Sequence, residues 1–279
     1  MLIKYLTSIL IINFLITDLY PQTIQESEKY AENQFQSGNY FNAITAYRRI
    51  LFFEPDQQNS EIFQNLSLCY FKLNDYKKSH YYNQLAYSME KNDSIKTEIG
   101  LKNVFMYILQ KEYNYALSDI LALPIPTSKY LLKKYNFYKG VIFFLQHKFI
   151  ESQQYFSLSL KHEDKRVQKK LDSLFLENKK ISRKKPVLAR YMCVFIPGSG
   201  QFYAGYPIDA LNSIAISGAF LYLYFYTIKT YSFIDGILAV LPWFERYYFG
   251  GMDNAEELTI KKINNKRNVI YKQILEIYY

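Results

Sequence analysis

Residues 38–43 read GNYFNA, and variants of this stretch return as NDYKKS at 74–79, KEYNYA at 111–116 and HKFIES at 147–152. The third position of each stretch is aromatic, at residues 40, 76, 113 and 149, which gives spacings of 36, 37 and 36. Self-similarity at a fixed period of this length is the signature of a repeat architecture. The stretch therefore predicts about four similar units between residues 23 and 165.

A second set of positions repeats with the same period. The last residue of each stretch is small, and the residue twelve positions earlier is small in three of the four units. This double periodicity predicts two antiparallel helices per unit, with the turn ending the first helix, the aromatic residue opening the second, and small residues at the crossing. The repeat-defining residues are Ala31, Gly38, Tyr40, Ala43, Ser67, Tyr76, Ser79, Tyr113, Ala116, Gly140, Phe149 and Ser152.

The first unit resembles the tetratricopeptide repeat. The match is carried by Ala31, Gly38, Tyr40, Ala43, Tyr47 and Pro55. Later units depart from that pattern, because their period exceeds the usual length of about 34 residues. The resemblance covers about residues 24–165 and implies a stacked solenoid whose concave groove, lined mostly by first helices, takes a peptide or protein partner.

Polar and aromatic residues on the expected first helices are the candidates for this partner groove. They are Asn65, Tyr70, Tyr107, Asn136 and Tyr138. The alternative reading is that the aromatic side chains are simply core.

The composition favours an all-α fold. Tyr (29) and Phe (21) are abundant while Gly (10) and Pro (8) are sparse, which suits helices packed through aromatic side chains better than a turn-rich β sandwich. Cys69 and Cys193 fall in different predicted domains, so they indicate neither a disulfide framework nor a metal site.

The positive charge is concentrated in one stretch. The net charge is +9, and residues 161–190 hold eleven Lys/Arg against four Asp/Glu, a local excess of +7. We interpret residues 166–186 as a basic capping helix or linker. A polybasic run beside an apolar segment is typical of contact with anionic lipid headgroups, and no nucleic-acid-binding module is recognisable.

Both ends of the chain carry apolar segments. Residues 1–22 have Lys4 before an apolar run and predict a signal peptide or N-terminal anchor; the alternative is a short buried helix. Residues 187–252 predict a membrane hairpin, with Ile208–Ile228 long enough to span a bilayer and Phe233–Trp243 completing the pair. Residues 253–279 form a basic, amphipathic tail.

A glycine-rich motif opens the hairpin. It reads PGSGQFYAG at 197–205, and Pro197, Gly198, Gly200, Gln201, Tyr203 and Gly205 define it. The motif resembles the Gly-rich turn of the two-transmembrane-helix domain family, over residues 186–268. That resemblance implies a domain type and no activity. The glycines allow the backbone to turn and to approach a neighbouring helix closely; the alternative is a ligand or lipid-binding loop. A homo-oligomer formed through the hairpin belongs to the alternative function given below.

No catalytic constellation is recognisable. The sequence has no phosphate-binding loop and no His-x-x-x-His pair, so we expect no enzyme activity, no metal and no cofactor. Four charged residues lie beside apolar segments and are the candidates for a buried polar role: Asp209, Asp235, Glu245 and Arg246. The alternative is that their charged ends extend to the membrane interface or that Glu245 and Arg246 pair locally.

The expected function is a membrane-tethered scaffold for protein interaction in the bacterial cell envelope, at the inner membrane with the repeats in the periplasm. An oligomeric membrane transport or insertion element with an accessory repeat domain is the alternative. The basic run 179–185 conflicts with export of the repeats. Export would place this run outside the cytoplasm, against the positive-inside tendency.

Overall fold

The computed structural model describes residues 23–53, 60–161 and 163–278. Over these ranges the chain forms helices and no strand, which confirms the predicted all-α class. The predicted signal segment 1–22 and Pro55 lie outside the described residues. The described residues fall into two compact units, the first ending at Ser159 and the second beginning at Leu160.

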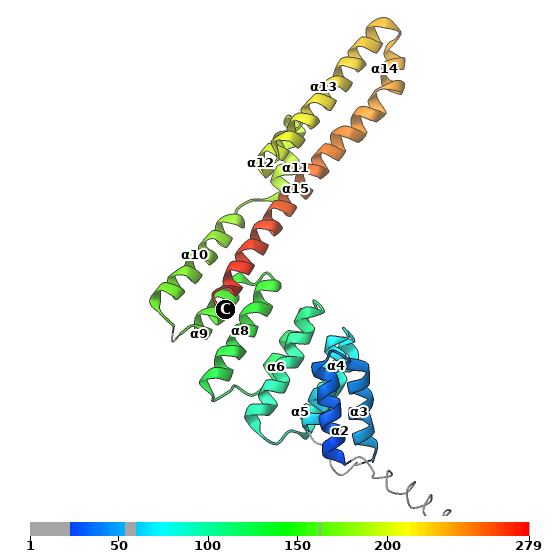
Figure 1. Cartoon of the computed structure of the whole chain (residues 1–279). Helices are drawn as coiled ribbons and strands as arrows, with labels where there is room; N and C mark the ends of the chain where they lie inside the picture. The colour runs from blue at the N-terminus through cyan, green and yellow to red at the C-terminus, as the bar shows by residue number, and fades with distance from the viewer. Residues whose placement is uncertain (1–22, 54–59, 162, 279) are drawn as a thin grey trace, which may run out of the picture. The chain divides into compact units, whose positions relative to one another are not determined.

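The first unit consists of consecutive helix pairs (Figure 1). Its helices are α2 (Ile24–Gln36), α3 (Tyr40–Phe53), α4 (Ser60–Lys72), α5 (Tyr76–Met89), α6 (Asp93–Leu109), α7 (Tyr113–Ala122), α8 (Lys129–Leu145) and α9 (Phe149–Ser159). Helix α2 packs on α3, α4 on α5, α6 on α7 and α8 on α9. The second helix of each pair begins at the repeated aromatic residue of the sequence motif.

The first helix of each pair ends in the same left-handed turn. The residue that opens each sequence motif has a positive φ: 78° at Gly38, 60° at Asn74, 62° at Lys111 and 62° at His147. In the second pair the amide of Asn74 donates to the carbonyl of Phe71, and the next amide donates to the carbonyl of Tyr70. The other three turns have the same two bonds. This pairing is the Schellman motif, which satisfies the last carbonyls of a helix.

Small residues lie where the two helices of a pair meet. Ser67 and Ser79 each donate a hydroxyl hydrogen bond to the other's main-chain carbonyl, both at 2.8 Å. The hydroxyl of Ser152 likewise donates to the carbonyl of Gly140 at 2.8 Å. A Cβ atom at Gly140 would lie 2.8 Å from the ring of Phe156, so a larger residue would force the helices apart.

The second unit is arranged around one long helix. Its helices are α10 (Lys165–Ile181), α11 (Pro186–Phe195), α12 (Ser199–Ala204), α13 (Pro207–Thr230), α14 (Phe233–Ala239) and α15 (Leu241–Leu275). All of the others pack against α15. The segment predicted as a basic cap or linker, 166–186, corresponds largely to α10. Helix α15 continues across the predicted boundary at 252/253, because its buried stripe of Met252, Ala255 and Thr259 keeps helical spacing there.

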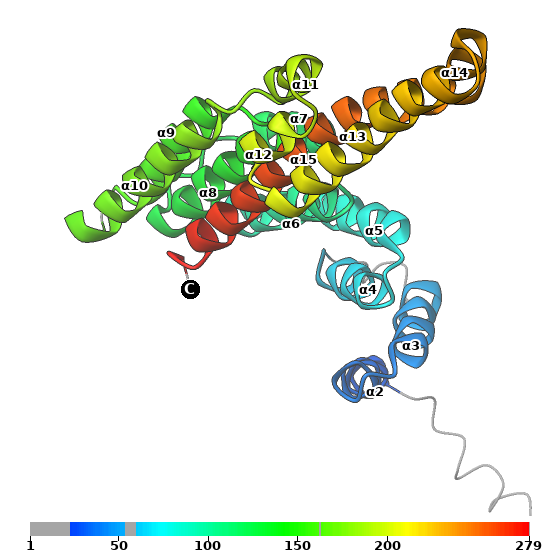
Figure 2. The same cartoon turned by 90° about the horizontal axis from the view of Figure 1, so that it is seen from above.

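Helix α13 has the length and composition of a membrane-crossing helix. It is the one such helix in the described ranges, and only 11% of its most apolar window is buried. Large apolar side chains are instead exposed, including Leu211, Tyr222 and Phe225. The next apolar segment, predicted as Phe233–Trp243, is divided between α14 and α15 at Val240. Figures 1 and 2 both show α13 running beside the first part of α15.

Candidate functional site

The first unit contains a cavity of about 560 Å³ between α4 and α6, with α5 at its floor. Its wall is largely apolar, and Leu68, Ile95 and Phe105 are exposed to the opening. The lining residues are Ser60, Glu61, Gln64, Asn65, Ser67, Leu68, Phe71, Ser79, Asn83, Glu90, Ile95, Lys102, Phe105 and Met106. An apolar side chain of a ligand that entered the cavity would therefore be buried, and it would cover apolar surface of these residues that is otherwise exposed to water.

The polar groups of the cavity floor are already paired within the protein. Ser67 and Ser79 bond to each other across α4 and α5. The amide of Asn83 donates to the carbonyl of Ile99 at 2.7 Å and to Oδ1 of Asn103 at 2.8 Å. These bonds fix α5 against α4 and α6. The floor supports the shape of the cavity and offers no activated nucleophile.

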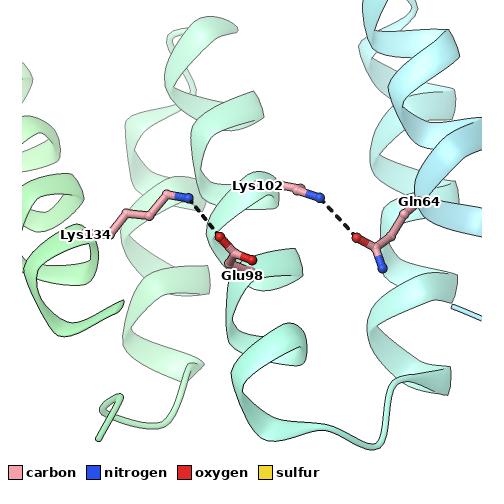
Figure 3. A network of polar contacts seen from close by, with 4 residues as sticks. All are labelled: Gln64, Glu98, Lys102 and Lys134. Atoms are coloured by element: carbon pink, nitrogen blue, oxygen red, sulfur yellow. Dashed lines mark hydrogen bonds and ion pairs between the residues drawn. The ribbon is translucent and has the colours of Figure 1, made fainter. Parts of the chain in front are cut away.

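Charged and polar side chains of the first helices line up in two neighbouring pairs (Figure 3). Lys102 Nζ of α6 donates to Gln64 Oε1 of α4 at 3.0 Å, and Lys134 Nζ of α8 lies 3.4 Å from Glu98 Oε1 of α6. Desolvation lowers the pKa of Lys102, with Glu98 acting in the opposite direction and Lys134 adding to the lowering. Lys102 is the one cation among the lining residues of the cavity, and an anionic ligand group would stabilise its charge.

Two acidic residues lie on the lining of the same cavity. They are Glu61 and Glu90. Glu90 accepts from the hydroxyl of Ser60 and from the amides of Lys91 and Asn92, and these bonds lower the pKa of its carboxyl group. The carboxylate of Glu90 therefore stabilises the segment that connects α5 and α6, and its oxygens already accept hydrogen bonds from the protein.

The five predicted groove residues are distributed over different environments. Asn65 lines the cavity. Tyr138 lies beside it, with its ring 6.2 Å from that of Phe105. Tyr70 is buried and stacks on Tyr82 at 5.3 Å, as the core alternative anticipated.

The remaining two candidates also contact other parts of the first unit. Asn136 is buried on α8. Tyr107 shares a hydrogen bond of 3.0 Å with Nε2 of His80 and packs its ring against Tyr115. The five residues therefore do not form one surface, and only Asn65 and Tyr138 lie at or next to the cavity.

Lys102 is a cavity residue that the sequence reasoning missed. The repeat spacing could have found it, because Asn65, Lys102 and Tyr138 are separated by 37 and 36 residues, the spacing of the aromatic positions 76, 113 and 149. Glu61, Glu98 and Lys134 follow the same rule. Equivalent positions in stacked repeats present equivalent faces, so one correct groove residue identifies the others.

In the second unit the glycine-rich motif packs α12 against three other helices. A Cβ atom at Gly200 would collide with the carbonyl of Ala189 and lie 2.8 Å from Cβ of Ala255. Gly198 has a φ of 89°, and a Cβ there would lie 2.5 Å from the carbonyl of Ala210 on α13. A side chain at either position would therefore have to displace backbone atoms of a neighbouring helix.

The polar members of the motif hold neighbouring segments. Gln201 is buried; its amide donates to the carbonyl of Gly251 at 2.8 Å and its Oε1 accepts from Cys193 at 3.3 Å. The hydroxyl of Tyr203 accepts from the amide of Lys185 at 3.1 Å. Gly205 ends α12 in a left-handed turn, and Pro197 lies just after α11. The motif is thus the packing centre of the second unit.

A second cavity, of about 430 Å³, lies between α13 and α15. Most of its surface is apolar, but polar side chains are among its lining residues, including Asp209, Ser213, Ser217, Arg246 and Asn254. Within the described ranges neither Asp209 nor Arg246 has an ion-pair partner.

The other two charged candidates lie elsewhere. The carboxyl group of Asp235 accepts from the hydroxyl of Ser232, the N-cap of α14, at 2.6 Å, while Glu245 is exposed. Among the described residues no group of three or more His, Cys, Asp or Glu side chains is placed to hold a metal ion.

Comparison with known proteins gives no family assignment. No protein-family model and no curated protein matches the chain.

Proposed function

We propose that this protein is a membrane-tethered scaffold without enzyme activity. In this proposal the helix pairs of the first unit form a tetratricopeptide-like solenoid that binds an extended peptide of another envelope protein. The observation that carries the proposal is the open, apolar-walled cavity between α4 and α6 with Lys102 in its lining.

The chemistry of the cavity selects the partner peptide. Leu68, Phe71 and Phe105 offer apolar surface to one side chain of the peptide. Lys102 bonds only a neutral amide oxygen within the described residues, so an acidic residue of the peptide is its natural counterion. We therefore propose a segment that combines an apolar side chain with a neighbouring Asp or Glu.

A displayed library of random peptides, selected against the full chain in nonionic detergent, tests this proposal. We expect enrichment of peptides that combine an apolar residue with an acidic one. Leu68→Glu or Lys102→Glu should then weaken the best peptide by about tenfold or more, through an unfavourable charge in the cavity.

Leu121→Glu is the matched control, because Leu121 is an exposed residue of α7 that does not line the cavity. The Leu121→Glu variant should bind the peptide with the affinity of the unchanged protein. An equal loss of affinity in this control, or no loss of affinity in either cavity variant, would show that the cavity is not the partner site.

The apolar segments supply the tether in this proposal. The length, hydropathy and exposure of α13 support a membrane hairpin completed by α14 and the start of α15. We place it in the inner membrane with the repeats in the periplasm. Alkaline phosphatase fused after Lys180 should be active in a bacterial host; fluorescence of a fluorescent protein fused there instead would place the repeats in the cytoplasm.

A second candidate function is favoured by the charged and polar side chains that line the cavity between α13 and α15, Asp209 and Arg246 among them. Polar groups inside a membrane-facing hairpin are costly unless they serve a solute path or a partner helix. If the hairpin oligomerises as a transport or insertion element, Asp209→Asn and Arg246→Met should abolish solute flux in proteoliposomes. If the unchanged protein gives no flux, or if neither variant changes the flux, the transport function is wrong.

A further inference from the structure

A lysine-rich cavity of about 580 Å³ lies between α10 and α15 in the second unit. Lys180 and Lys184 enter it from the end of α10 and the segment after it, and Lys262 and Lys266 from α15. Glu177 is the one acidic residue of its lining, so the lining carries an excess of three positive charges.

These lysines are not neutralised by the protein. Within the described residues none of the four has an ion-pair partner. Lys184 Nζ donates to the carbonyl of Tyr203 at 2.8 Å. Desolvation lowers the pKa of Lys184, and the positive charges of Lys266 and Lys262 lower it further. Like charges held this close to one another are stabilised by an anion among them.

Aromatic rings hold two of the ammonium groups at the cavity. Lys184 Nζ lies 5.3 Å from the ring centre of Tyr203, and Lys262 Nζ lies 5.3 Å from that of Tyr206. Tyr203 belongs to the glycine-rich motif in α12, and Tyr206 is the residue that precedes α13. The site is therefore built partly by the segment that leads into the apolar helix.

The cavity is also apolar on one side. Leu176, Ile181 and Ile263 contribute to its lining, and Leu176 is exposed. A free inorganic anion would make no favourable contact with this apolar surface, whereas a lipid carries hydrocarbon close to its charged group and could contact both. Exposed apolar residues of α11, such as Val187 and Leu188, lie three and four residues after Lys184 in the chain.

We propose that this cavity binds the phosphate-bearing headgroup of an anionic phospholipid, with Lys184, Lys262 and Lys266 as its main contacts. The inference rests on the proposed attachment to a membrane. It differs from a diffuse attraction of the basic stretch 161–190, because half of its lysines come from α15 and because it requires one defined site.

The test is titration calorimetry on the full chain in nonionic detergent. Short-chain phosphatidylglycerol should bind, short-chain phosphatidylcholine should not, and inorganic phosphate should bind at least about tenfold more weakly than phosphatidylglycerol. Equal binding of phosphatidylcholine would overturn the proposal. Binding of inorganic phosphate as tight as that of the lipid would identify a free-phosphate site instead and overturn the lipid assignment.

A pair of double variants with the same charge change separates a site from net charge. Lys262→Gln with Lys266→Gln should weaken phosphatidylglycerol binding by about tenfold or more, since each lysine near a lipid surface contributes substantially. Lys261→Gln with Lys272→Gln changes exposed lysines of the same helix that do not line the cavity, and should leave the affinity unchanged. Equal losses in both pairs, with unchanged helical circular dichroism, would overturn the proposal.

Membrane attachment is tested separately by washing native membranes with alkaline carbonate. The unchanged chain and both double variants should stay in the washed membranes, because α13 holds them there. Release of the unchanged chain would contradict the attachment, whereas the calorimetry in detergent would still decide the lysine site.

Discussion

The turns between paired helices place ordinary residues in a conformation that favours glycine. Gly38 has no side chain at its left-handed position, but Asn74, Lys111 and His147 carry one at φ values of 60° to 62°. A left-handed conformation costs a residue with a Cβ atom about 1–2 kcal/mol. Three of the four turns therefore hold local strain that the packing of the helix pairs overcomes.

Lys111→Gly should raise the free energy of unfolding by roughly 0.5–1 kcal/mol, because the relief of strain exceeds the added entropy of the unfolded chain. Lys111→Ala is the matched control and should have little effect, since alanine keeps the Cβ atom. Gly38→Ala should destabilise the first unit by about 1 kcal/mol. Urea unfolding followed by circular dichroism measures all three, and equal stability of the Gly and Ala variants at 111 would contradict the strain argument.

His80 gives the first unit a pH-dependent contribution to stability. Burial lowers its pKa below the ordinary value of 6.5, although the charge of Asp119 and a hydrogen bond with the Asn103 side chain act in the opposite direction. Its contribution to stability is therefore fully present above that ordinary value and is lost as the pH falls through the lowered pKa. The contribution of Asp119 to stability changes with pH in the opposite direction. Burial raises the pKa of its carboxyl group, so the folded protein binds a proton there at a higher pH than the unfolded chain does.

We expect the free energy of unfolding to fall between pH 7 and pH 5 in the unchanged protein and to fall less in His80→Gln. The difference arises because the unfolded chain binds a proton at position 80 more readily than the folded one. Denaturant unfolding at the two pH values measures it. Parallel pH profiles of the two proteins would show that His80 is not responsible.

At the scale of the element, α12 is the part of the second unit most sensitive to added volume. Gly200→Ala should destabilise this unit by about 1–3 kcal/mol, because its new methyl group meets the backbone of Ala189. Gly218→Ala on α13 is the control, since a Cβ there has no neighbour within 4 Å. Thermal unfolding in detergent should show a lower midpoint for the first variant only; equal midpoints would mean that α12 adjusts its position without cost.

The helix pairs were predictable because turns and helix starts are local. The motif at 38–43 and its three variants carry the left-handed residue, the opening aromatic and the small crossing residue within six positions. The cavity was not predictable from the same signals, since it depends on the separation of α4 and α6. The candidates Asn65 and Tyr70 are five positions apart, about 140° around a helix, so they could not share one face.

At the scale of the whole molecule, the two units differ in what their surfaces expose. The first unit combines buried cores with a mixed surface, whereas α13 exposes a continuous series of large apolar side chains. Soluble proteins rarely expose such patches unless they bind a partner or a membrane. The contrast agrees with the proposed division, in which the first unit binds a partner and the second unit attaches to a membrane.

Arginine on the exposed face of α13 tests that division. Leu221→Arg with Phe225→Arg should remove most of the protein from carbonate-washed membranes, because each arginine near the centre of a spanning helix costs about 2.5–3.5 kcal/mol. Leu121→Arg on α7 adds the same group to the first unit and should leave retention unchanged. Full retention of the double variant would argue that α13 does not cross the membrane.

Helix α15 is unbroken from Leu241 to Leu275. At 1.5 Å per residue its 35 residues extend over roughly 52 Å. Its first part packs beside α13, and its later part carries Lys262 and Lys266 into the lysine-rich cavity. A continuous helix tilts as one stiff lever, so a change in bilayer thickness that tilts the apolar part would move these two lysines relative to α10. If the hairpin spans a bilayer and the cavity binds a lipid headgroup, as we propose, a change in membrane geometry would therefore change the headgroup affinity.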